Sequence, residues 1–231
     1  MNPVKLINSC ENCVVGWKNF ANLSTSEIRL VNENRYEAVF KPGEILIKQG
    51  SPISHAVFLS RGMAKSFIEG ADGKNYILEI LRPSSLIIGS GVYVDLRNSV
   101  SVAALTEVHT CFISLQIINQ LVQTNPGFAA GMIQDLGIKA FQNHQRLASF
   151  IQKKMPGRLA EALLFFADEL YKTKTFELIL SKQELGEMTN MAKESVVRIL
   201  KELNSSGVVE SVGTVIRILD IDKLRMISEK G

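Results

Sequence analysis

The segment from Leu180 to Leu203, LSKQELGEMTNMAKESVVRILKEL, constrains the fold most, because its pattern predicts two short helices joined by a sharp bend. Ser181 and Glu184 have the S-x-x-E spacing of a capping box, which begins the first helix. Asn190 favours the bend, since asparagine tolerates left-handed backbone. The apolar residues of the second helix recur at helical spacing and are expected to be buried: Val196, Ile199, Leu200 and Leu203.

Three charged side chains of the second helix lie off its apolar stripe. Arg198 can fork onto the O6 and N7 atoms of guanine, and Glu194 can accept a hydrogen bond from the N4 amine of cytosine. Lys193, at the helix start, can hold a base edge or a phosphate. Glu194 and Arg198 are four residues apart and project side by side, so an ordinary exposed ion pair is the alternative. The spacing alone favours neither interpretation.

The segment AKESVVRIL resembles the recognition helix of the CRP/FNR regulators, in which the pattern R/K-E-x-x-x-R precedes hydrophobic residues. The matching positions are Lys193, Glu194 and Arg198, closer to the CRP branch than to the E-x-x-S-R pattern of the FNR branch. Ala192 replaces the usual capping Ser or Thr, which weakens the helix start by about 1 kcal/mol. The resemblance implies double-stranded DNA as a partner. The further candidate contacts to DNA are Lys182, Ser195, Lys201, Thr214 and Arg217.

Bulk properties exclude some classes of protein. The net charge of +3 is too small to argue for DNA binding, so phosphate contacts must come from the local placement of cations. The sequence lacks both an 18-residue apolar run and the apolar core of a signal peptide, and we expect a cytoplasmic protein with reduced cysteines and no membrane contact. No Walker loop, G-x-S-x-G or H-E-x-x-H motif is present, so we do not expect an enzyme.

The region from Tyr36 to Ser114 alternates with a period of two and is divided by turn signals, among them Gly43, Gly50, Gly62 and Gly73. This pattern predicts an antiparallel sandwich or barrel. The segments KPGEILIKQG, LSRGMAKSF and DGKNYIL resemble the double-stranded β-roll of cyclic-nucleotide-binding domains. In the CRP/FNR family this roll is the sensor, so the resemblance implies a small-molecule effector.

The same resemblance locates an effector pocket. In cAMP-binding members a glutamate of a G-E-L motif holds the ribose, and an arginine of an R-S-A motif neutralises the phosphate. Here Ser90 takes the glutamate position and Asn98 the arginine position, while Arg97 would point the other way on a strand. Losing the cation should cost about 2–5 kcal/mol, so we expect that cAMP is not bound tightly. The pocket for another effector would be lined by Ile88, Gly89, Ser90, Asn98 and Ser99.

The cysteines suggest a rival sensor. FNR-type members hold a 4Fe–4S cluster with three N-terminal cysteines and one from the β-roll. Cys10, Cys13 and Cys111 resemble three of these, but the remaining N-terminal cysteine, expected near Asn19, is absent. Such clusters usually need four thiolates, so three would suffice only with an outside ligand such as His109, Asp95 or a small molecule. We favour reduced thiols with Cys111 as a buried strand residue. A zinc site on these cysteines, or haem bound through His144, is no better supported.

Asn125-Pro126 begins the longest expected helix, which runs to about Phe150 and carries a seam with coiled-coil spacing. The seam could pack on the chain's own β-roll, whereas the family resemblance implies packing on the same helix of a second subunit. Such a homodimer would place two recognition helices about one DNA turn apart, suited to a palindrome. The seam residues are Phe128, Met132, Leu136, Ala140, Asn143, Leu147 and Phe150.

These patterns together predict an α+β fold. We expect a double-stranded β-helix sensor of the jelly-roll type in residues 1–124, a dimerisation helix in 125–152, and a winged helix-turn-helix in 153–231. KKMPG at 153–157 would be the hinge, 158–171 a helix, and 207–219 the wing. The resemblance implies a transcription regulator that acts with RNA polymerase. The alternatives are a redox or gas sensor using an Fe–S cluster or haem, and a cyclic-nucleotide sensor module of an enzyme or channel.

Overall fold

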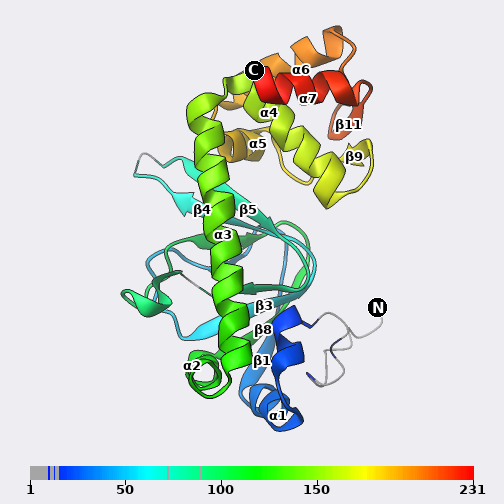
Figure 1. The fold of residues 1–231 in the computed structure, drawn as a ribbon. Helices are drawn as coiled ribbons and strands as arrows, with labels where there is room; N and C mark the ends of the chain where they lie inside the picture. Colours follow the sequence, from blue (N-terminus) through cyan, green and yellow to red (C-terminus); the bar gives the residue numbers. More distant parts are fainter. Residues whose placement is uncertain (1–9, 11–12, 14–15, 72, 89) are drawn as a thin grey trace. The chain divides into compact units, whose positions relative to one another are not determined.

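The computed structural model describes residues 10, 13, 16–71, 73–88 and 90–231 (Figure 1). These residues form two compact units. The first unit holds the described residues up to Gly73 together with Leu78–Lys139, and the second holds Lys74–Ile77 with Ala140–Gly231. None of the described helices combines the length and the apolar character that a membrane crossing requires.

The first unit is built on two four-stranded sheets, as the period of two predicted. One sheet has the order β1-β8-β3-β6, with β1 at Arg35–Phe40, β8 at Val108–Ser114, β3 at His55–Arg61 and β6 at Ser85–Ile87. The other has the order β2-β7-β4-β5, with β2 at Ile45–Ile47, β7 at Ser101–Ala104, β4 at Ala64–Glu69 and β5 at Asn75–Leu81. Strand β5 belongs to this unit from Leu78 onward. The helical segments of this unit are η2 (Lys18–Asn22), α1 (Thr25–Glu33), η3 (Ser90–Tyr93), α2 (Leu115–Thr124) and the start of α3 (Pro126–Gln152).

Strand β3 separates two apolar cores, because its side chains alternate between the faces of its sheet. Val57 and Leu59 lie in one core with Val102 and Ala104 of the other sheet, so the two sheets pack as a sandwich. Phe58 points into the second core, which the helices complete. Coverage on both faces explains why β3 is a nearly continuous apolar run.

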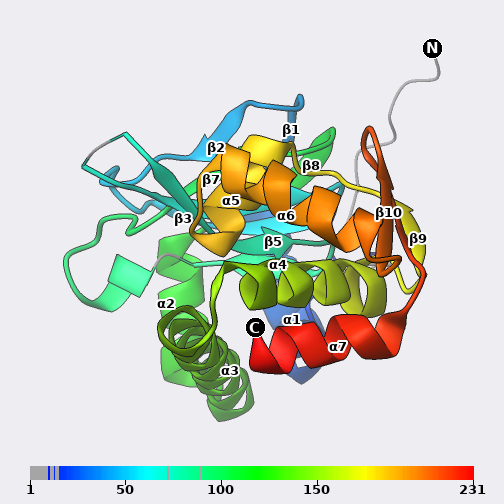
Figure 2. The ribbon, with the colours of Figure 1, turned by 90° about the horizontal axis from the view of Figure 1, so that it is seen from above.

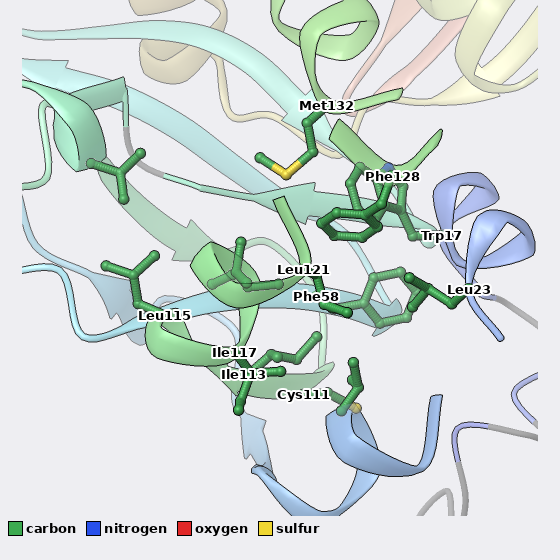
Figure 3. Packing of buried hydrophobic residues seen from close by; sticks show 14 of the residues in the cluster. Trp17, Leu23, Phe58, Cys111, Ile113, Leu115, Ile117, Leu121, Phe128 and Met132 are labelled. Carbon is green, nitrogen blue, oxygen red and sulfur yellow. The ribbon is translucent and has the colours of Figure 1, made fainter. Parts of the chain in front are cut away.

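Figure 3 shows the second core around Phe58. Trp17 and Phe128 meet there edge to face, with ring centroids 5.5 Å apart. Phe128 and Met132, from the first turns of α3, are buried in this cluster. The prediction that these two residues belong to an intersubunit seam was therefore wrong. Their apolar side chains are already covered by the chain's own core.

Two further expectations differ from the structure. Helix α2 was missed, because its apolar residues continue the run of β8 without a turn signal, and its N-cap Ser114 makes no side-chain capping bond. The helix expected from Arg158 begins earlier, since α4 spans Met155–Leu164 and has Pro156 in its first turn. The chain then widens into a π-helical segment, η4 (Phe165–Leu170).

The second unit contains the predicted helix pair and wing. A three-stranded sheet has the order β10-β11-β9, and α7 lies beside α4 (Figure 2). The remaining elements of this unit are β9 (Thr175–Glu177), α5 (Lys182–Thr189), α6 (Lys193–Ser205), β10 (Val209–Val212), β11 (Val215–Ile218) and α7 (Ile221–Lys230). The α+β architecture, with a β-sandwich, a long helix and a winged helix-turn-helix, is confirmed.

Local signals set the geometry of the helix pair. The Ser181 side chain accepts a hydrogen bond from the Glu184 amide, and the Glu184 carboxylate accepts one from the Ser181 amide, which forms the capping box. Asn190 ends α5 with φ 51° and ψ 56°, in the left-handed region. Gly186 lets the turn close, since a Cβ at this position would lie 2.6 Å from the Met191 carbonyl oxygen.

Gly186→Ala is therefore expected to destabilise the protein by about 1–3 kcal/mol, because the added methyl meets backbone that can yield only by opening the turn. The change would be measured as a lower denaturant midpoint. Gly137→Ala in α3 is the matched control, since its Cβ meets nothing within 4 Å. It should raise stability by up to about 1 kcal/mol through helix propensity. Equal shifts for the two variants would contradict this role of Gly186.

Candidate nucleic-acid interface

Helix α6 has one buried face and one charged, exposed face. Its apolar residues fill the core of the second unit: Val196, Ile199, Leu200 and Leu203. Lys193, Glu194, Arg198 and Lys201 are exposed, and Ser195 is half-buried. As predicted, Ala192 caps the helix without a side-chain hydrogen bond. The helix therefore presents charged side chains on a rigid support.

Two arginines hold the turn that precedes α6. Arg146 Nη2 donates to the carbonyl oxygen of Met188 at 2.7 Å and to that of Ile77 at 2.6 Å. Arg158 Nη1 donates to the Asn190 carbonyl oxygen at 3.2 Å. The bonds to Met188 and Asn190 satisfy carbonyls at the end of α5 that have no partner within the helix. Sequence reasoning missed both arginines, because no local pattern links α3 or α4 to a turn at least 30 residues away.

The ion pair on α6 is not the expected one. Arg198 Nη1 lies 2.7 Å from Glu202 Oε1, one turn further along the helix, rather than paired with Glu194. Glu194 and Glu202 are each four residues from Arg198. The usual preference is for a glutamate N-terminal to its basic partner, as Glu194 is, so the observed pair has the opposite order. The arrangement leaves the Glu194 carboxylate exposed and gives Arg198 a partner that any ligand must displace.

The wing also carries paired polar groups. The Thr214 hydroxyl donates to Glu177 Oε1 at 2.8 Å, and Arg217 Nη1 lies 3.1 Å from Glu210 Oε2. Both Thr214 and Arg217 are exposed. Between β10 and β11, Gly213 has a positive φ of 61°, which closes the tight turn. These donors can reach a phosphate only after leaving their carboxylate partners.

Lys182 differs from the other candidate contacts. It is half-buried at the start of α5, and its Nζ is enclosed without a hydrogen-bond partner. Desolvation lowers the pKa of its amine. The amine therefore faces the protein rather than solvent, and its side chain would have to turn outward to meet DNA.

The segment predicted to form the effector pocket is internally bonded. Asn98 Nδ2 donates to the hydroxyl of Ser51 at 3.1 Å and to its carbonyl oxygen at 3.3 Å. Arg97 precedes β7 rather than lying within a named strand, and its Nη1 donates to the Gly50 carbonyl oxygen at 2.7 Å. Both side chains thus hold the 50–52 loop. Among the other predicted residues, Ile88 packs against the second core, Ser90 begins η3, Ser99 is exposed, and Gly89 lies outside the described residues.

The three cysteines gather at the second core. Cys10 and Cys13 pack against the cluster that contains Cys111, and Arg35 Nη1 lies 3.5 Å from the Cys111 sulfur. Burial raises the pKa of Cys111 to about 11, so this thiol stays protonated near neutral pH. Within the described ranges, no group of three or more His, Cys, Asp or Glu side chains is arranged to hold a metal ion. The interpretation of Cys10, Cys13 and Cys111 as reduced thiols remains a prediction.

The comparisons with known proteins identify both units. The family described as "Cyclic nucleotide-binding domain" matches residues 37–125, and that described as "Crp-like helix-turn-helix domain" matches residues 157–227. The chain belongs to the CRP/FNR family. It is a DNA-binding transcriptional regulator, and the CRP/FNR family is not enzymatic.

Individual CRP/FNR relatives are distant. The cAMP-activated global transcriptional regulator CRP of Salmonella typhimurium is 25% identical over 175 residues, which cover 74% of this chain and 83% of that protein. The transcriptional activator Anr of Pseudomonas aeruginosa is 24% identical over 184 residues, which cover 78% of this chain and 75% of that protein. The structure of FixK2 from Bradyrhizobium japonicum matches the fold with a TM-score of 0.75 at 16% identity, over 84% of this chain and 96% of that one.

Proposed function

We propose that this regulator binds a palindromic operator as a homodimer and controls transcription in response to an effector other than cAMP. In this proposal residues 1–124 are the sensor, 125–152 the dimerisation helix and 153–231 the DNA-binding domain. RNA polymerase would be the second macromolecular partner. The observation that carries the proposal is α6, whose apolar face is buried while Lys193, Glu194 and Arg198 remain exposed.

The exposed side chains of α6 suit the major groove. Arg198 would fork onto a guanine, and Glu194 would accept from a cytosine amine. Lys193, Ser195 and Lys201 would contact base edges or phosphates. The wing would add Thr214 and Arg217 on the backbone, and Lys182 would contribute if its side chain turned outward. Because so many of these contacts are to phosphates, affinity should fall steeply with salt.

The pair between Arg198 and Glu202 gives a specific expectation. Glu202→Gln should strengthen operator binding about twofold to fivefold, because Arg198 no longer leaves an ion partner and one negative charge near the phosphates is removed. Fluorescence anisotropy at fixed salt would measure the change. Glu229→Gln on α7 is the control, with the same change in charge at another exposed position of the same unit. An unchanged or lower affinity for Glu202→Gln would argue against this competition.

An exposed apolar stripe on α3 supports the homodimer. Ile133, Leu136, Leu147 and Ile151 are all at least 49% exposed, and Ala140 is exposed between them. Their spacing of three, four and seven residues keeps them on one face of the helix. Leu136, Ala140 and Leu147 were expected in the seam, whereas Phe150 is half-buried against Tyr76. Asn143 is exposed, as is His144. A second copy of α3 would cover this stripe.

The pocket chemistry supports an effector other than cAMP. The Asn98 amide carries no charge, and its hydrogen bonds hold Ser51. We therefore expect that millimolar cAMP leaves the unfolding temperature and the operator affinity unchanged, because a ligand stabilises only the state that it binds. The cAMP-activated CRP of Salmonella typhimurium is the positive control. A saturable rise in the unfolding temperature with cAMP would overturn this part of the proposal.

Selection of bound sequences from a random pool of duplex DNA tests the proposal directly. The purified protein should enrich an inverted repeat whose half-site centres are about one helical turn apart. The enriched half-site should contain a guanine for Arg198 and a cytosine for Glu194. Enrichment of a single unrepeated site would refute the dimer, and the absence of enrichment would refute sequence-specific binding.

A further inference from the structure

The exposed face of α6 contains one apolar side chain. Val197 is half-buried, whereas its neighbours Val196, Ile199 and Leu200 are fully buried in the core. At about 100° per residue, Val197 lies about 40° around the helix from Lys193 and about 60° from Glu194. It therefore sits between two of the proposed base contacts rather than on the core side of the helix.

The position of Val197 leaves part of its side chain open to a ligand. Lys193 precedes it by one turn and Lys201 follows it by one turn, and both are exposed. The long, flexible side chains of Lys193 and Lys201 can move to phosphates. The short, branched side chain of Val197 stays fixed by its χ1 preference. The methyl groups of Val197 would then face the floor of the groove that Glu194 and Arg198 read.

We infer that Val197 reads the C5-methyl group of a thymine. Thymine is the base that presents an apolar group in the major groove, and an apolar side chain meets it without a hydrogen bond. Because Val197 is adjacent to Arg198, the thymine should lie within one base pair of the guanine that Arg198 contacts. This inference rests on the proposed function, and it makes Val197 a residue that determines operator specificity.

The test uses the operator selected by the wild-type protein. Each thymine of the half-site is replaced in turn by deoxyuridine, which keeps the base pairing and removes only the methyl group. At one position per half-site the wild-type affinity should fall about fourfold, the value expected for one buried methyl group. The measurement on the wild-type protein needs no variant, so a folding defect cannot obscure it.

A variant then assigns the effect to Val197. Val197→Ala should lose the uracil penalty at that position, and selection with this variant should relax the preference for thymine there while keeping the guanine read by Arg198. Asn204→Ala is the control, since Asn204 is exposed on the same helix nearly two turns further along. It should keep the full uracil penalty.

The outcomes separate this inference from the proposed function. If an inverted repeat is selected but every uracil is tolerated, Val197 does not read a methyl group and the proposed function stands. The same conclusion follows if Val197→Ala retains the full penalty. If no sequence is enriched, sequence-specific binding fails and this inference fails with it.

Discussion

Arg198→Ala is expected to weaken binding to the selected operator by about 1–3 kcal/mol per half-site and to relax the choice at one base pair. The guanidinium offers two parallel donors to the O6 and N7 atoms of guanine, and alanine offers none. In the free protein Arg198 is paired with Glu202 at 2.7 Å. The measured loss of binding free energy is therefore the contribution of the guanine contact minus the cost of leaving that partner. Fluorescence anisotropy with the operator, at one salt concentration, gives the affinity, and repeated selection gives the base preference.

The control for Arg198 is Arg225→Ala. The two arginines are matched, because their side chains are 56% and 54% exposed and each is paired with a carboxylate on its own unit. Both substitutions remove one positive charge from the protein. A large loss for Arg198 alone would show a base contact, whereas equal losses or an unchanged base preference would reduce its role to bulk electrostatics.

Leu147→Glu is expected to convert the protein into a monomer and to lower operator affinity by at least about a hundredfold. Leu147 is 58% exposed in the isolated chain, so a carboxylate there should be tolerated by the fold. In a two-fold dimer the substitution occurs twice on one self-complementary surface, and two buried like charges are strongly unfavourable. A monomer would engage one half-site and lose the second. Sedimentation equilibrium and operator titration would measure the two effects.

Gln145→Glu is the control for the seam. It lies on the same helix about 160° around from Leu147 by the helical period, is exposed, and makes the same change in charge. The variant should remain dimeric with nearly unchanged affinity. If Leu147→Glu unfolds at the wild-type temperature and still dimerises, the exposed stripe on α3 is not the interface.

Prediction from sequence succeeded where the signal and the structure are both local. The capping box of Ser181 and Glu184 and the left-handed Asn190 fix one turn of backbone within a few residues of themselves. Local hydrogen bonds of this kind do not depend on what packs around them. The bend before α6, and with it the face that α6 exposes, could therefore be predicted.

Prediction was wrong where one pattern suits two structures. The seam expected on α3 has the same apolar spacing whether a core or a partner covers it. Phe128 and Met132 are covered by the second core, whereas Leu136 and Leu147 remain exposed. Periodicity identifies a helix face but not what lies against that face.

The sequence by itself determined the α+β architecture, the helix pair and the charged residues of α6, because turn signals, caps and apolar periods act over short distances. Only the tertiary structure decided that Asn98 holds Ser51, that Arg198 is paired with Glu202, and that Arg146 supports the turn before α6. In the cases of Asn98 and Arg146 the partners are 47 and 42 residues apart in the chain. For Arg198 two carboxylates stand four residues away, one on each side along the helix, and the spacing in the sequence does not distinguish between them.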